Sequence, residues 1–147
     1  MAVGDAARRD GPETHEFPPD ELPGAQFEAW REPELILLKA AESANVVPAP
    51  DESIDGAPQT VVRVASPFQG LDVTLYIDKK TKMLSRVHYV DHGQPVTDDF
   101  ADYKPVNGIK VAYKRNSTSG GRPTSLELQK VEIDPKIDPA IFNKPGK

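Results

Sequence analysis

The chain has 147 residues, of which 37% are hydrophobic and 28% charged, and its formal net charge is −5. This length fits one domain with a core of its own, and the acidic balance without a basic stripe excludes nucleic acid as an expected partner. The sequence has no cysteine, which excludes disulfides, thiolate metal sites and cysteine nucleophiles. No window approaches the roughly 20 apolar residues of a membrane span, and the first residues lack the apolar stretch of a signal peptide.

Residues 1–19 contain Gly, Pro and charged residues and almost no large apolar side chain. Such a segment buries too little surface to offset its ordering entropy, so we expect a flexible lead. The alternative is that Thr14 to Phe17 begins a strand. Residues 20–147 are then expected to form a single domain.

Residues 20–44 are predicted to be helical, with an interruption at Pro23-Gly24 and one main helix from Pro33 to Ser43. Pro33 suits the first helical position, and Glu34 complements the positive helix N-terminus. The apolar residues of this helix cover more than half of its circumference, so we expect it to be mostly buried. It either packs on a sheet or plugs a ligand groove, and the sequence does not separate the two.

Residues 45–58 are rich in proline and predict a connector. A strand is expected over 59–65, followed by one over 71–78 in which Leu71, Val73, Leu75 and Ile77 share a face. Such period-two alternation is typical of a sheet with one covered face. Further strands are predicted over 82–91 and 96–103.

Asn107-Gly108 is a strong hairpin signal and introduces a strand that begins at Ile109. The last strand, over 124–133, changes parity between its leucines and Val131, which predicts a bulge near Gln129-Lys130. Residues 137–142 are expected to form an apolar clasp on the sheet edge. The fold class is therefore α+β, with a twisted, half-barrel-like antiparallel meander of about six strands covered by one main helix.

The sequence offers no convincing catalytic centre. Asp98, Asp99 and Asp102 could supply paired carboxylates, but exposed aspartates on a strand are more typical of a solvated face. His88 and His92, with Asp91 and Asp98, lack the spacing of a metal site. No phosphate-binding loop, nucleophile elbow or dinucleotide motif is present. We therefore expect no enzyme activity, no metal and no cofactor.

The C-terminal strands resemble the outer-membrane lipoprotein carrier-like (lipoprotein-sorting) superfamily over about residues 59–145. The pattern of turn, Phe-x-Asp-Tyr, Val-Asn-Gly, Ile-Asp-Pro and Phe-x-x-Pro falls on Asp78, Phe100, Asp102, Tyr103, Val106, Asn107, Gly108, Ile137, Asp138, Pro139, Phe142 and Pro145. Residues 30–42 are similar to the helical stretch that precedes these strands. The same stretches are also similar to C-terminal extensions of bacterial insulinase-like zinc peptidases.

The resemblance implies an incomplete barrel around helices, with an apolar cavity for acyl chains, in the periplasm or cell envelope. The chain departs from the family because it lacks a signal peptide and is short at its N-terminal side, which fits an excised or truncated domain. The expected function is a non-catalytic module for an apolar ligand such as a lipoprotein acyl chain. The alternative is an accessory or docking domain of a zinc peptidase, which would bind protein.

The ligand-lining residues proposed from this pattern come from the apolar sheet face and from the helix above it. They are Leu71, Val73, Leu75, Ile77, Phe100, Val111, Tyr113 and Leu126 on the sheet, with Trp30, Leu35 and Leu38 on the helical side.

Overall fold

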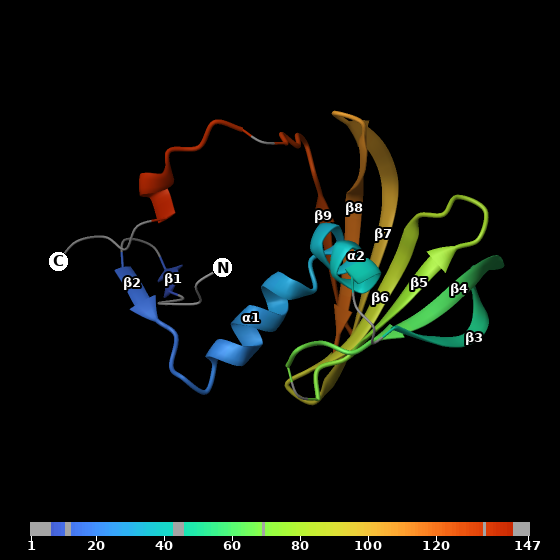
Figure 1. The fold of residues 1–147 in the computed structure, drawn as a ribbon, viewed down its shortest axis with the longest axis horizontal. Coiled ribbons are helices and arrows are strands. Elements are labelled where there is room, and N and C mark those ends of the chain that lie inside the picture. Colours follow the sequence, from blue (N-terminus) through green and yellow to red (C-terminus); the bar gives the residue numbers. More distant parts are fainter. Residues whose placement is uncertain (1–6, 11–12, 43–45, 69, 134, 143–147) are drawn as a thin grey trace.

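The computed structural model describes residues 7–10, 13–42, 46–68, 70–133 and 135–142, and it describes their side chains except at 7–10, 13–15, 39, 40, 141 and 142. Its main element is a seven-stranded antiparallel sheet in which each strand pairs with the next along the chain. The strands curve around the second of two short helices (Figure 1). The strands are β3 (Val46–Ile54), β4 (Ala57–Val64), β5 (Val73–Asp78), β6 (Leu84–Asp91), β7 (Gln94–Val106), β8 (Ile109–Ser119) and β9 (Arg122–Glu127).

The antiparallel meander confirms the predicted topology, but the sheet has seven strands instead of about six. The additional strand is β3, in the segment predicted to be a connector. It occupies one edge of the sheet and pairs only with β4, with a register shift between Ala49 and Glu52. Pro48 and Pro50 are tolerated there because an edge strand has a side on which missing N–H donors break no ladder bond.

The last strand is shorter than predicted, because β9 ends at Glu127. Residues 128–133 do not belong to a strand, so the expected bulge near Gln129-Lys130 is absent. The parity change in the sequence marks the end of the strand. The preceding strand, β8, extends to Ser119. Gly120 and Gly121 then form the turn between β8 and β9, with positive φ angles of 52° and 78°.

Two short helices are present, α1 (Leu22–Trp30) and α2 (Pro33–Glu42). The second begins at Pro33 and matches the predicted main helix, while the first lies in the stretch where an interruption was expected. The proline at position 23 does not interrupt α1, because it lies in the first turn, where the backbone N–H groups have no partner inside the helix. The N–H of Arg31 donates to the carbonyl of Phe27 as α1 ends, and the carbonyl of Glu32 accepts from Ile36 as α2 begins. No helix among the described residues is long and apolar enough to cross a membrane.

The inner face of the sheet, defined here as the face that carries Val73, Leu75 and Val87, forms the core together with Phe27 of α1 and Ile36 of α2. Phe27 lies at the centre of this contact. Its ring stacks on Trp30 at 6.1 Å between centroids and meets Tyr89 edge-on at 5.8 Å. Leu71 and Ile77 pack against the same cluster, as the alternation predicted.

The expected burial of α2 is wrong. Ile36 is 0% exposed, whereas Leu35 and Leu38, two proposed ligand-lining residues, are 45% and 61% exposed. Consecutive residues of a helix point in different directions. When one residue faces the sheet, the residues next to it in the sequence therefore point toward solvent. The helix therefore contributes little more than one side chain to the core.

The N-terminal segment predicted to be flexible contains a small antiparallel hairpin, β1 (Ala7–Asp10) and β2 (Glu13–Glu16). The short 3-10 helix η1 (Pro139–Phe142) lies away from the sheet (Figure 1). Ile137 is exposed, so it does not clasp the sheet edge. The side chain of Phe142, the other anchor of the expected clasp, lies outside the described residues.

The contrast within α2 gives a direct test of the core. We expect Ile36→Ala to lower the free energy of unfolding by about 2–5 kcal/mol, because it empties a fully buried site. Leu38→Ala on the same helix should change it by less than about 0.5 kcal/mol. Urea unfolding of both variants measures the difference, and equal effects would show that α2 does not pack through Ile36.

Candidate functional site

The inner face is sealed at one end and hollow at the other. Val73 and Leu75, both proposed as ligand lining, are 1% exposed and belong to the same cluster as Phe27 and Ile36. At these positions helix and sheet pack on each other. Hollows lie farther along the face, around Phe100.

The largest of these, which we call the open-end hollow, has a volume of about 510 Å³. It lies between the β5–β6 turn and β7. Its lining combines apolar side chains with a few polar groups: Asp78, Thr81, Met83, Leu84, Ser85, Phe100, Tyr103 and Lys110. Half of these residues are polar or charged, and the volume lies within the range of small-molecule sites.

A kink at Asp102 brings Phe100 and Tyr103 into this hollow together. Side chains three residues apart in a regular strand point to opposite faces. Asp102 has a φ of 53°, and the Cα pairing of β7 with β8 skips it. The Tyr103 hydroxyl then donates a 2.7 Å hydrogen bond to the carbonyl of Leu84, and burial raises the pKa of Tyr103 to about 12.

The second hollow, which we call the junction hollow, has a volume of about 260 Å³ and lies between the α1–α2 junction and β7–β9. Phe100 lines it as well, so the two hollows meet at one ring. Its other lining residues are Arg31, Glu32, Pro33, Tyr89, Asp98, Arg115, Asn116, Ser117, Thr124 and Leu126.

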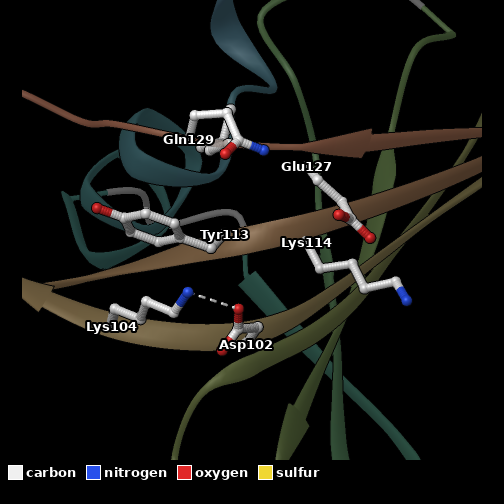
Figure 2. Close-up of a pocket in the computed structure, with 7 residues that line it drawn as sticks. Asp102, Lys104, Tyr113, Lys114, Glu127 and Gln129 are labelled. Carbon is white, nitrogen blue, oxygen red and sulfur yellow. Dashed lines mark ion pairs between the residues drawn. The ribbon is translucent and has the colours of Figure 1, made fainter.

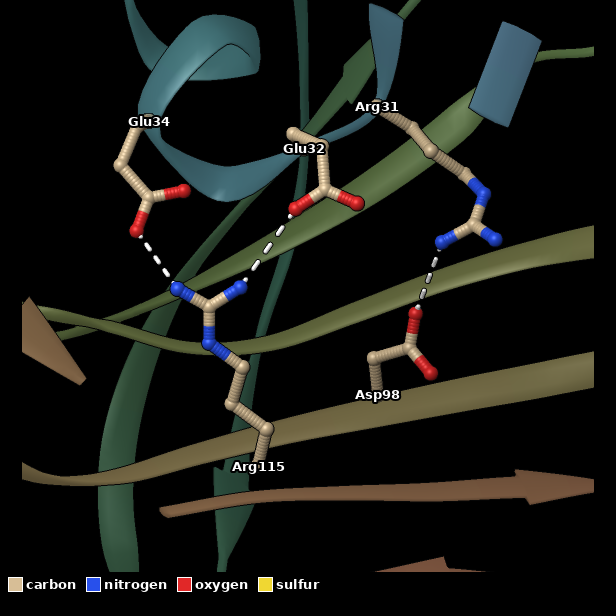
Figure 3. Close-up of polar contacts among 5 residues, drawn as sticks. All are labelled: Arg31, Glu32, Glu34, Asp98 and Arg115. Carbon is tan, nitrogen blue, oxygen red and sulfur yellow. Dashed lines mark hydrogen bonds and ion pairs between the residues drawn. The ribbon is translucent and has the colours of Figure 1, made fainter. Parts of the chain in front are cut away.

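Ion pairs cross the junction hollow between the helices and the sheet (Figure 3). Arg31 donates to Asp98 of β7 at 3.3 Å and lies 4.3 Å from the centroid of the Tyr89 ring. Arg115 of β8 donates to Glu34 at 2.7 Å and to Glu32 at 3.4 Å. The Nε atoms of both arginines are buried without a hydrogen-bond partner, so neither guanidinium is fully satisfied.

A third hollow of about 260 Å³ lies at the β7–β9 side, lined by Asp102, Lys104, Tyr113, Lys114, Glu127, Leu128 and Gln129 (Figure 2). Lys104 pairs with Asp102 at 2.9 Å and its ammonium lies 4.5 Å from the centroid of the Tyr113 ring. Tyr113, proposed as lining for an apolar ligand, therefore faces a polar surface instead.

The remaining proposed lining residues are spread over the molecule. Trp30 packs on the core cluster, and Val111 is buried outside that cluster. Leu126 lines the junction hollow but is 53% exposed, because β9 is an uncovered edge strand. Of the proposed set, Phe100 alone lines both hollows on the inner face.

Sequence reasoning missed Met83, Leu84, Tyr103 and Lys110 of the open-end hollow. Three of them fall at turns or beside them, where strand alternation carries no information. Tyr103 could have been proposed, because it is the last residue of the Phe-x-Asp-Tyr pattern. The positive φ of Asp102, however, could not be predicted from the sequence.

The three clustered aspartates do not form a carboxylate pair. Asp98 contacts Arg31, Asp99 receives two hydrogen bonds from Arg86 at 2.6 and 3.1 Å, and Asp102 pairs with Lys104. Asp98 and Asp99 are neighbours in a strand and point to opposite faces. Each carboxylate is therefore held by its own cation.

The histidines are separated in the same way. His88 contacts the Thr97 hydroxyl through its Nδ1 at 3.3 Å, while His92 contacts Asp91 in the adjoining turn. Within the described part of the chain, no group of three or more His, Asp or Glu residues is placed to hold a metal ion.

The chain is similar to the crystal structure of a putative outer membrane lipoprotein-sorting protein domain from Vibrio parahaemolyticus, with a TM-score of 0.52 and 21% sequence identity. The likeness covers 67% of this chain and 45% of that chain. No family model matches the sequence, and no curated protein matches it.

This likeness confirms the predicted lipoprotein-carrier-like fold, and at this identity it concerns the fold alone. The chain spans less than half the length of the structure that it matches. The similarity to peptidase extensions, and with it the docking alternative, stays a prediction.

Tyr103 provides a test of the open-end hollow. Tyr103→Phe leaves the Leu84 carbonyl without its donor, so we expect the free energy of unfolding to fall by about 1–3 kcal/mol near neutral pH. The raised pKa adds a pH dependence: between pH 10 and about 12 the unfolded phenol ionises while the folded one stays neutral. The stability advantage of the wild type over Tyr103→Phe should therefore shrink across that window.

Urea midpoints of both proteins at about pH 8 and about pH 11 measure this change. An advantage that is constant between the two pH values would contradict the buried, hydrogen-bonded position of Tyr103.

Proposed function

We propose that this chain is a non-catalytic binding module of the cell envelope that holds an apolar ligand on the inner face of its half-barrel. The observation that carries the proposal is the open-end hollow of about 510 Å³, with Met83, Leu84 and Phe100 in its wall. Phe27 and Ile36 of the helices fill the other end of the face, which leaves this hollow as the uncovered part.

The likeness to a lipoprotein-sorting domain supports this ligand class and this location. The junction hollow extends the surface past Phe100 toward Leu126. An acyl chain that lies across Phe100 would use both hollows, and burial of its methylenes would supply most of the affinity.

The pairing of the ionisable groups supports a module without catalysis. A general acid or base needs a titratable group that is free to exchange a proton with substrate. The carboxylates of Asp98, Asp99 and Asp102 instead compensate nearby cations. Their arrangement favours structural roles over proton transfer.

Binding is tested with a fluorescent long-chain apolar probe. We expect Met83→Trp to weaken binding by about tenfold, because the indole fills the hollow and displaces contacts worth about 1.4 kcal/mol. The matched control is Val90→Trp, since Val90 is exposed and lines neither inner-face hollow. Thermal unfolding checks that both variants are folded.

Mass spectrometry of a solvent extract from the purified protein supplies an independent measurement. Absence of any co-purified lipid together with no uptake of the probe would refute the proposed function. Equal loss of binding in the two tryptophan variants would place the ligand elsewhere.

A further inference from the structure

The polar groups of the open-end hollow differ in whether their hydrogen-bonding capacity is already used. Asp78 is held by its own turn: its Oδ1 accepts from the backbone N–H of Lys80 at 2.9 Å and of Thr81 at 2.6 Å. These bonds keep the pKa of the Asp78 carboxyl below its ordinary value. The carboxylate thus belongs to the β5–β6 hairpin.

Two further polar groups in the wall are also occupied. The Tyr103 hydroxyl donates to the Leu84 carbonyl, and the Thr81 hydroxyl accepts from the N–H of Met83 at 3.3 Å. These bonds tie the rim of the hollow together, so a ligand would have to break structure to recruit them.

Lys110 and Ser85 remain. Among the described residues, neither side chain has an ion pair or a hydrogen bond, although both line the hollow. Lys110 offers donors and a positive charge and has no acceptor, and the Ser85 hydroxyl can add one donor. The unused capacity of the hollow therefore suits a ligand group that accepts hydrogen bonds and carries negative charge.

We propose that the open-end hollow binds a single-chain fatty carboxylate, with the carboxylate on Lys110 and Ser85 and the alkyl chain along Leu84 and Phe100. This assignment rests on the proposed function and adds the polarity and the orientation of the ligand. One free ammonium matches a monoanion, whereas a phosphate monoester carries about −1.5 to −2 charges near neutral pH. The charge at the rim thus favours a carboxylate head over a phosphate head.

The size of the effect follows from the exposure of Lys110. An exposed ion pair contributes little and is screened by salt. We expect the wild type to bind hexadecanoate about three- to fivefold more tightly than hexadecanol, in the range of exposed ion pairs. The preference should weaken as the salt concentration rises.

The test displaces the fluorescent apolar probe with hexadecanoate or hexadecanol from the wild type, Lys110→Gln and Lys110→Glu. Lys110→Gln should abolish the preference for the acid over the alcohol, and Lys110→Glu should reverse it. Lys114→Gln is the matched control, because Lys114 is an exposed lysine of the same strand that lines a different hollow. That control should keep the preference of the wild type.

The possible failures are distinguishable. If neither compound displaces the probe, the proposed function fails and this inference fails with it. If acid and alcohol bind equally well to the wild type, or if Lys110→Gln keeps the preference, the assignment of Lys110 is wrong while apolar binding stands. A single-chain phosphate monoester that binds more tightly than hexadecanoate would overturn the choice of head group.

Discussion

The contact of Phe27 and Ile36 with the concave face of the sheet determines which part of that face is core and which part is open. Phe27 brings α1 onto Tyr89 and Phe68, and Ile36 brings α2 onto the same cluster. Each buried side chain of this size contributes about 1.5–3 kcal/mol. Because two short helices can cover only part of a seven-stranded sheet, the face beyond Phe100 is left without a helical partner, and the open-end hollow lies there.

Charge pairing fixes the same helices from the polar side. Arg31 and Arg115 each reach from one layer to carboxylates of the other. Such partly buried pairs contribute less to stability than to specificity, because desolvation offsets the attraction and each guanidinium keeps one unsatisfied Nε. The ion pairs favour one position of the α1–α2 junction on the sheet, whereas an apolar contact alone would permit other positions. Asp98, Asp99 and Asp102 each lie against a cation of their own.

The sequence predicted the strand order and the core face of β5, because period-two alternation and turn residues are local signals. It failed where a local signal had two physical meanings. Pro48 and Pro50 are as compatible with an edge strand as with a connector, and the choice depends on whether β4 needs a neighbour. Apolar residues all around α2 predicted burial, yet Ile36 is buried while Leu35 and Leu38 are exposed, since helix orientation is set by tertiary contact. The lining of the candidate site was predicted less well than the fold, because side chains at turns follow no periodic pattern.

The kink at Asp102 is the irregularity of β7 that lies next to the open-end hollow. An unbroken β7 would alternate through residue 103 and place Phe100 and Tyr103 on opposite faces. The positive φ at Asp102 instead puts both rings against Leu84, and the Asp102–Lys104 ion pair lies beside the kink. Left-handed backbone in a residue other than glycine costs about 1–3 kcal/mol and persists where its surroundings require it. Here the hydrogen bond of Tyr103 and the packing of Phe100 meet that requirement. The strained residue therefore lies between the two aromatic residues that line the open-end hollow.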